Sequence, residues 1–122
     1  MKRFIILIFV MIGLIAQAGV GAIILTPKGP TDNRSGNPLF FDKPEAFHHY
    51  DEKIQEIIID GGGAVSYYNV EISSTATNAV EISTQVNGAF DIIDIASLAT
   101  GLHVITIYSP TGNSFEGFFS TY

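Results

Sequence analysis

The chain has 122 residues, no cysteine, and twelve acidic against six basic residues, which gives a formal net charge of −6 at pH 7. Without cysteine there are no disulfide staples and no lipid-modified cysteine anchor, so stability must come from core burial. The acidic balance argues against nucleic acid and anionic membranes as partners, since both require clustered Lys and Arg. We expect the negative surface to keep the domain soluble.

The first 18 residues have the layout of a secretory signal peptide. Lys2 and Arg3 precede an apolar run over residues 4–15, and small residues surround a predicted cleavage point after Ala18. The run is shorter than the roughly 20 residues that a membrane-spanning helix needs. An uncleaved anchor is the alternative, because apolar residues resume at positions 20–25. Cleavage would leave a single domain with four basic and twelve acidic residues, a formal charge of −8.

The mature N-terminal part, residues 19–44, is predicted to hold one strand and a loop. The strand is Ala22–Leu25, and the following stretch is rich in Pro, Gly, Asn, Asp and Ser, which favour turns and coil. Leu39–Phe41 is predicted to form a brief edge pairing within that loop. Asn33 opens a tripeptide that matches a glycosylation sequon.

The stretch from Pro44 to Ile58 allows two interpretations. Its apolar residues fall at helical spacing behind a proline, which would suit a single amphipathic helix. We favour two strands, Ala46–Tyr50 and Ile54–Ile59, because three consecutive β-branched isoleucines end the stretch and Gly61-Gly62-Gly63 then breaks it. The glycines lack a following Lys-Ser or helix, so we read them as a flexible connector and not as a phosphate-binding loop.

Alternation of apolar and polar residues becomes clear beyond residue 66. It predicts two strands joined by a turn over 73–78, then a hairpin turn at Asn87-Gly88, two residues that tolerate positive φ. Further turns are predicted at 99–101 and 110–113. The inward-facing residues are Tyr68, Val70, Ile72, Val80, Ile82, Val86, Ile93, Ile95, His103, Ile105, Ile107, Phe115, Gly117 and Phe119, with Leu98 at the end of its strand. About seven short strands with turns every eight to twelve residues predict an all-β antiparallel sandwich.

Three C-terminal motifs resemble a known family. They are Ile93-Asp94-Ile95-Ala96-Ser97-Leu98, then Gly101 with Ile105 and Ile107, then Gly112 with Gly117-Phe118-Phe119. On these residues the chain resembles the small secreted proteins of Bacteroides-type gut bacteria that are grouped as a domain of unknown function. The resemblance covers residues 45–122 and implies an immunoglobulin-like sandwich and export. It implies no activity and no site residue.

The chain departs from that family at two places. The family has an aromatic residue two positions after the turn glycine, where this chain has His103, and a glycine turn in the central hairpin, where this chain has residues 74–78. The C-terminal pattern is also similar to β-sandwich sorting domains of a bacterial outer-membrane secretion system. Those domains end in a short basic and aliphatic tail, whereas this chain ends in Phe-Ser-Thr-Tyr.

The sequence predicts no catalytic residue, metal ligand set or cofactor, and we expect no enzyme. His48 and His49 are adjacent, so on a strand they point to opposite faces and cannot share one ion. His103 lies among apolar residues and is expected to be a core histidine. Asp91 and Asp94 are three apart on a strand, which suits turn capping and not a paired acid and base.

One surface is a candidate for partner binding. If His103, Ile105 and Ile107 point inward, an apolar and aromatic strip points outward on the last hairpin, and such strips often mark interaction surfaces. Alternatively, Ile23, Ile24, Leu39 and Phe40 of the N-terminal segment cover it. The strip consists of Leu102, Val104, Tyr108, Phe118 and Tyr122.

The predicted function is a non-catalytic module, exported to the periplasm, cell surface or medium, that binds a protein or a glycan or associates with itself. The mature chain is expected to have no membrane span. A structural subunit that donates its N-terminal strand to a cell-surface assembly is the alternative, since that strand precedes a long coil. An enzyme with an unrecognised site is the third hypothesis.

Overall fold

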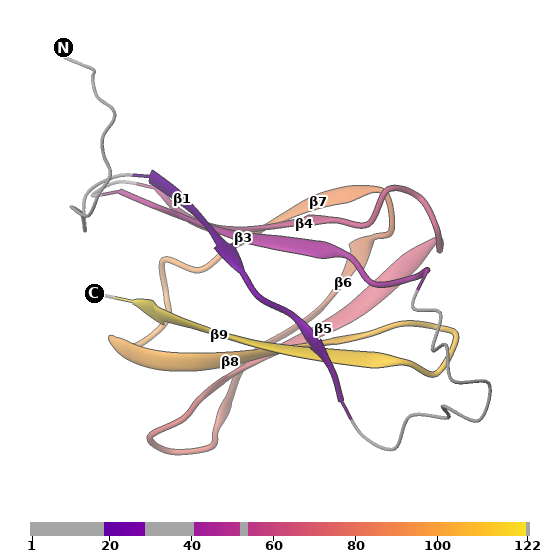
Figure 1. Cartoon of the computed structure of the whole chain (residues 1–122). Coiled ribbons are helices and arrows are strands. Elements are labelled where there is room, and N and C mark those ends of the chain that lie inside the picture. The colour runs from indigo at the N-terminus through magenta and orange to yellow at the C-terminus, as the bar shows by residue number, and fades with distance from the viewer. Residues whose placement is uncertain (1–18, 29–40, 52–53, 122) are drawn as a thin grey trace, which may run out of the picture.

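A computed structural model describes residues 19–28, 41–51 and 54–121, which fold into two β-sheets without any helix (Figure 1). The predicted signal peptide, the Asn33 sequon, Leu39 and Phe40 lie outside these residues. The strands are β1 (Gly19–Ile23), β2 (Thr26–Pro27), β3 (Glu45–Tyr50), β4 (Gln55–Asp60), β5 (Tyr67–Ser74), β6 (Val80–Asn87), β7 (Phe90–Asp94), β8 (Gly101–Tyr108) and β9 (Ser114–Thr121).

The two sheets form a β-sandwich in which every strand pairing is antiparallel. One sheet has the order β1-β3-β4-β7 and the other the order β2-β9-β8-β5-β6. The all-β antiparallel sandwich predicted from the alternation is therefore confirmed. The described residues hold nine strands instead of about seven, partly because the N-terminal segment contributes two short ones.

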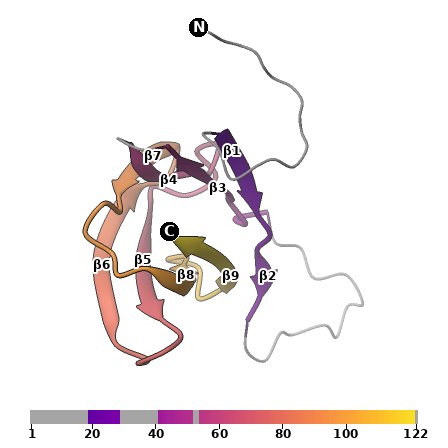
Figure 2. The same ribbon diagram turned by 90° about the vertical axis from the view of Figure 1, so that its left-hand side faces the viewer.

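The N-terminal segment passes from one sheet to the other (Figure 2). The predicted strand Ala22–Leu25 was wrong in its bounds: β1 begins at Gly19 and pairs with β3, and β2, within the predicted loop, pairs with β9. The two residues between them bring about the change of sheet. Leu25 is buried between the sheets while Ile24 is 77% exposed. We call residues 19–27 the N-terminal strap.

Residues 45–60 form the hairpin β3–β4, so the two-strand interpretation is confirmed and the helix interpretation is wrong. The Asp51 carboxylate accepts a hydrogen bond of 2.6 Å from the Ile54 backbone N–H across the turn. Ala46, Ile57 and Ile59 are buried on the inner face. Burial of alternate residues stabilises strands here, because a helix would spread the same side chains over a different face.

The core lies between the sheets and is built mainly from the residues that the alternation placed inward. Tyr68, Phe115 and the inward isoleucines of β4, β5, β7 and β8 carry most of its volume, and Leu98 packs against it while partly buried. The buried hydrophobic residues are Ile23, Leu25, Ala46, Ile57, Ile59, Tyr68, Val70, Ile72, Val86, Ile93, Ile95, Ile105, Ile107, Phe115 and Phe119.

The Asn87-Gly88 hairpin prediction was wrong, because these residues form a crossover between the two sheets. β6 pairs with β5 in one sheet, whereas β7 pairs with β4 in the other. Neither Asn87 nor Gly88 has a positive φ. Glycine is required at 88 for a different reason: a Cβ there would lie 1.9 Å from the Val65 carbonyl oxygen.

The triple glycine lies beside this crossover and is packed, in contrast to the predicted flexible connector. The N–H groups of Gly61 and Gly62 donate to the Ala89 carbonyl at 3.0 and 3.1 Å, and Gly63 N–H donates to the Gly88 carbonyl at 3.2 Å. Gly62 and Gly63 have positive φ values of 67° and 84°. The β4–β5 and β6–β7 connections, which both cross between the sheets, are therefore hydrogen-bonded to each other.

A β-bulge overturns the inward placement of Val80. The register of β5 with β6 shifts between Ile72 and Ser73, so Ile72 pairs with Ile82 while Ser73 pairs with Val80, and Glu81 is the additional residue. Such an insertion exchanges the faces of the residues beyond it. Val80 is consequently 54% exposed on the outer side.

Candidate functional site

The predicted partner surface lies on the outer face of the five-stranded sheet. Val104 of β8 pairs with Phe118 of β9, and Leu102 pairs with Ser120. Leu102 and Phe118 are 47% and 55% exposed, while Val104 is half-buried. The same cross-strand row continues through Ser73 to Val80, which the bulge turned outward. We call Leu102, Val104, Phe118 and Val80 the outer patch.

Tyr108 is separated from the outer patch. It lies four residues beyond Val104, about 13 Å along the strand, and the intervening row pairs Thr106 with Glu116. The Tyr108 hydroxyl donates to the Glu71 carboxylate at 3.4 Å. Burial, followed by the Glu71 charge, raises the pKa of Tyr108. The predicted strip is therefore divided by polar residues, and Tyr122 lies outside the described residues.

The described part of the N-terminal strap runs along the sandwich edges. Ile23 points into the core, Ile24 is exposed, and β2 pairs with β9 at the sheet edge. Lys28, just beyond the strap, forms an ion pair of 3.7 Å with Glu116. β1 therefore lies beside β3 and β2 beside β9, and neither Ile23 nor Ile24 covers the predicted strip. Leu39 and Phe40 lie outside the described residues.

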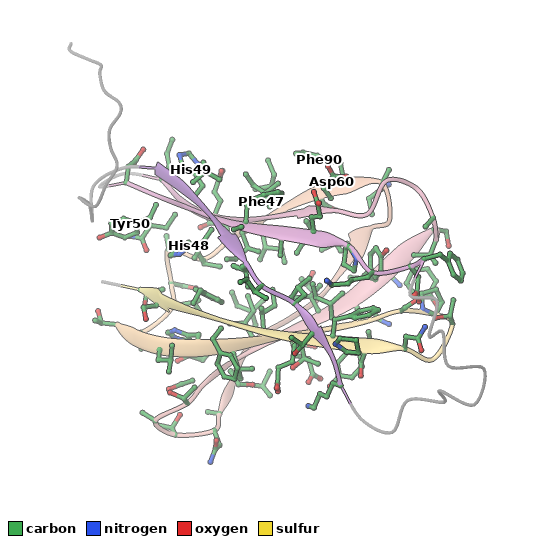
Figure 3. The ribbon with its side chains drawn as sticks, viewed as in Figure 1. Phe47, His48, His49, Tyr50, Asp60 and Phe90 are labelled. Atoms are coloured by element: carbon green, nitrogen blue, oxygen red, sulfur yellow. The ribbon has the colours of Figure 1, made fainter. Side chains whose placement is uncertain are left out.

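A second apolar surface, not predicted from the sequence, crosses the four-stranded sheet. Ala22, Phe47, Ile58 and Ile92 stand in one cross-strand row on its outer face. Phe90 adjoins the row, and Figure 3 shows Phe47, Phe90 and Asp60 on this side of the molecule. The signal was present in Ile57-Ile58-Ile59: when both flanking isoleucines are buried, the middle one must point outward.

His48 and His49 point to opposite faces of β3, as predicted (Figure 3). His49 Nδ1 lies 3.3 Å from Glu56 Oε1, and its Nε2 lies 4.0 Å from Asp51 Oδ2. The His48 ring packs inward, with its centroid 5.2 Å from that of Phe119. Among the described residues, no group of three His, Asp or Glu side chains is arranged to hold a metal ion.

His48 has no hydrogen-bond partner for its buried Nε2 among the described residues. Burial lowers the pKa of His48, and the neighbouring charge of His49 lowers it further. The ring therefore favours its neutral form and serves as a flat packing element against Phe119 and Tyr50.

His103 is a core residue, as expected from the sequence, and both of its ring nitrogens are engaged. It is 1% exposed, with Nδ1 3.0 Å from the Gly101 carbonyl and Nε2 2.7 Å from Glu81 Oε1. Because a carbonyl oxygen only accepts, Nδ1 donates. The ring also stacks on Phe119 at 5.6 Å with an interplanar angle of 18°, so it fills the place of an aromatic residue.

The bulge explains how Glu81 reaches His103. As the additional residue of β6, Glu81 is released from the outward position that strict alternation would give it. Sequence reasoning had paired Glu81 with the outward residues and therefore missed this contact. With both nitrogens occupied by protein groups, His103 offers no free position for proton transfer to a substrate.

Asp42 is a buried carboxylate that the sequence analysis did not identify. Asp42 accepts hydrogen bonds from the Thr111 hydroxyl and, at 3.2 Å, from the Asn113 side-chain amide, and its backbone carbonyl accepts from the Tyr68 hydroxyl at 2.6 Å. Burial alone raises the pKa of Asp42, but hydrogen bonds from Ser109, Thr111 and Asn113 outweigh it, so the pKa is lowered. This cluster fixes residue 42 to the β8–β9 turn.

Asp91 and Asp94 cap turns, as predicted. Asp91 Oδ2 accepts from the Asn87 N–H at 2.8 Å, and Asp94 Oδ1 accepts from the Ala96 N–H at 2.9 Å. The described part of the chain contains no helix long and apolar enough to cross a bilayer. The main apolar features of the described surface are the outer faces of the two sheets.

Comparisons with known proteins bear on the fold. No family model matches the sequence, and no curated protein matches it either. A solved structure does match: the crystal structure of a DUF3244 family protein with an immunoglobulin-like β-sandwich fold from Bacteroides vulgatus. The match has a TM-score of 0.63 and 14% sequence identity, and it covers 85% of this chain and 100% of the other.

At that identity the likeness establishes the fold alone. The chain has an immunoglobulin-like β-sandwich, as its C-terminal motifs implied. The neighbour is a domain of unknown function from Bacteroides, the kind of protein that those motifs resemble.

Proposed function

We propose that the chain is an exported, non-catalytic immunoglobulin-like module that binds a protein or a glycan, or a second copy of itself, through the outer patch. The observation that carries this proposal is the exposure of Phe118, the cross-strand partner of Val104, and of Leu102, two residues before Val104 on β8. When a partner covers an exposed aromatic ring among aliphatic side chains, a large apolar area is removed from water and few polar groups lose their hydration.

The position of the patch supports this function. β8 is paired on both sides, with β5 and β9, so its side chains are held by a rigid sheet. A preorganised surface loses little side-chain entropy on binding. Ser73, between Val104 and Val80, and Ser120, opposite Leu102, supply hydroxyl groups for polar contacts with a partner.

The strand-donating subunit is the alternative, and the N-terminal strap bears on it. β1 and β2 are paired within their own domain, and Ile23 and Leu25 are buried. Donation would therefore require the strap to leave both sheets first. An enzyme would need a site that none of the described titratable clusters provides.

The test compares the wild-type mature domain with the double variant Leu102→Ser/Phe118→Ser. Each protein is immobilised and exposed to envelope and medium fractions and to a glycan array, and light scattering after size exclusion reports self-association. We expect the wild type to retain a partner that the double variant loses. Ile24→Ser removes an even more exposed apolar side chain outside the patch and should leave binding unchanged.

The variant Tyr108→Ser tests whether binding depends on the outer patch alone or on the whole predicted strip. Because a polar row divides Tyr108 from Phe118, we expect this variant to bind nearly as well as the wild type. Equal binding by the wild type and the Leu102→Ser/Phe118→Ser variant would rule out the outer patch as the binding surface.

A further inference from the structure

The five-stranded sheet ends in an unprotected edge at β6. Among the described residues, β5 is the only strand that pairs with it, and Figure 2 shows it on the flank of the sandwich. β6 is eight residues long, and residues 82–87 contain no charge, no proline and no glycine. Natural sheets usually protect their edges with charged residues, proline or a bulge, because an open edge offers unpaired backbone groups to another chain.

The other three edges of the sandwich are protected or broken. β7 carries Asp91 and Asp94, whose charges would meet like charges in a second copy. β2 is two residues long and contains Pro27, and β1 contains Gly19 and Gly21. Of the strands in the described part of the chain, β6 is therefore the edge best suited to pairing.

The backbone hydrogen bonds at the end of β6 identify which backbone groups face its open side. Gly88 N–H donates to the Ser66 carbonyl at 3.0 Å, which places residue 88 toward β5. Since backbone groups alternate in direction along a strand, Val86 and Thr84 also face β5. Ser83 and Gln85 then turn their N–H and C=O groups outward, while the outward N–H of Asn87 is occupied by Asp91.

We propose that β6 pairs antiparallel with β6 of a second copy about a two-fold axis at Thr84. In this register Ser83 faces Gln85 of the second copy and the two exchange backbone hydrogen bonds, twice by symmetry. Ile82 faces Val86, so apolar side chains meet on the inner side. Glu81, the one charged residue of the strand, faces the uncharged Asn87.

The two ends of β6 limit the pairing to residues 82–86. The bulge at Glu81 twists one end away, and the Gly88 crossover turns the other end toward the second sheet. Four backbone hydrogen bonds and two apolar pairs make a small interface between acidic molecules. We therefore expect a weak dimer whose population rises with salt, because added ions screen the repulsion beyond about 8 Å at physiological ionic strength.

This dimer goes beyond the proposed function and does not depend on it. It would join two five-stranded sheets into one continuous sheet and place two copies of the outer patch on the same face. Val80 belongs to both features, since it lies in β6 and in the patch. A ligand with repeated units would then be bound at two points.

The absence of cysteine makes disulfide trapping a clean test. Thr84→Cys places two thiols opposite each other in a non-hydrogen-bonded pair, with Cα atoms about 4.5 Å apart, which is within disulfide range. We expect rapid dimer formation under mild oxidation. Thr77→Cys, in an exposed turn, measures chance collisions and should cross-link at least tenfold more slowly.

The register is tested by mixing two single variants. Ser83→Cys and Gln85→Cys should each cross-link slowly alone and rapidly when combined. Gln85→Pro removes an outward N–H that pairs with no strand in the described part of the chain, so it should leave thermal unfolding unchanged and abolish the dimer seen by sedimentation. Phe118→Ser should leave the dimer intact.

Two results would overturn the proposal. One is cross-linking of Thr84→Cys no faster than that of Thr77→Cys, with a wild type that sediments as a monomer at all concentrations. The other is a dimer that Phe118→Ser abolishes and Gln85→Pro does not, which would assign self-association to the outer patch. Loss of partner binding in the patch variants, by contrast, does not affect the edge pairing.

Discussion

Phe119 joins the two sheets through two histidines that differ in their electrostatic environment. His103 stacks on it from its own sheet and has both nitrogens hydrogen-bonded, whereas His48 packs on it from the opposite sheet without a partner for Nε2. A neutral imidazole fits the His48 site, because a buried cation without a counterion is costly. His103 is thus held by hydrogen bonds to its own sheet, whereas His48 contributes only the packing of its ring.

The lowered pKa of His48 predicts a loss of stability in mild acid. A histidine whose pKa is lower in the folded state takes up its proton more readily when unfolded, so stability decreases as pH falls through the ordinary histidine pKa of 6.5. The loss is about 1.4 kcal/mol for each unit by which the two pKa values differ. Urea unfolding between pH 8 and pH 5 measures this slope.

His48→Phe should flatten the slope, because phenylalanine keeps the aromatic contact with Phe119 and does not titrate. His49→Gln, on the outer face of the same strand, removes only the smaller cause of the lowered His48 pKa and should retain most of the slope, because burial is the larger cause. Asp42 does not interfere, because its pKa is lowered and its contribution is lost only below its ordinary pKa of 3.8. An unchanged slope in His48→Phe would show that another group controls the acid response.

At the scale of strands, local alternation was sufficient to predict what faces the core. Period-2 patterns identified β5, β8 and β9 with their inward residues, because burial on one face fixes the register. The errors concern non-local arrangement. Asn87-Gly88 has the composition of a hairpin turn, but the pairing of β7 with β4 decides its geometry. The bulge at Glu81 likewise depends on how two strands, β5 and β6, pair with each other.

The candidate surfaces were predictable to a similar extent. Leu102, Val104 and Phe118 were assigned outward from one hairpin, and the structure brings them together. The addition of Val80 and the separation of Tyr108 depend on which strands neighbour that hairpin, which a single sequence does not specify. The second apolar surface, on the four-stranded sheet, was missed because Ala22 and Ile92 join the β3–β4 hairpin from strands that are distant in sequence.

The close packing at the crossover predicts that Gly88→Ala is strongly destabilising. An added Cβ would lie 1.9 Å from the Val65 carbonyl oxygen and 2.8 Å from the Ser66 carbonyl carbon. These are backbone atoms held by the neighbouring crossover, so they cannot yield as a flexible side chain would. We expect a loss of about 3 kcal/mol in the free energy of unfolding, measured by chemical denaturation.

Gly21→Ala is the matched control, because a Cβ at residue 21 meets no atom within 4 Å. Its stability should equal or slightly exceed that of the wild type, since alanine loses less backbone entropy on folding. Similar stabilities for the two variants would mean that the crossover can shift to admit a methyl group.

For the whole molecule, the N-terminal strap holds the sandwich together on one side. It pairs with β3 of one sheet and β9 of the other, and it buries Ile23 and Leu25 between them. Gly117 admits this close approach, because a Cβ there would lie 2.6 Å from Ile23 Cγ2. Like the β4–β5, β6–β7 and β7–β8 connections, the strap joins the two sheets covalently, and it does so at the edges formed by β1 and β2.

Removal of residues 19–28 should therefore destabilise the mature domain severely. Burial of Ile23 and Leu25 contributes about 1.5–3 kcal/mol each, a large part of the 5–15 kcal/mol that typical domains possess. Thermal unfolding of the truncated domain measures the loss. A synthetic peptide of residues 19–28 added in trans should raise the melting temperature in a concentration-dependent way, and the same peptide with Ile23→Asp should not.

The rescue experiment also decides whether strand donation is feasible. A truncated domain that binds the peptide has a groove able to accept the same strand from another copy, whereas a truncated domain as stable as the wild type would show that the strap contributes little and would make donation by it untenable. Because the strap pairs along edges of the sandwich opposite to β6 in the strand order, strap exchange and β6 pairing could proceed independently, and the Gln85→Pro variant should accept the peptide as well as the unmodified truncated domain does.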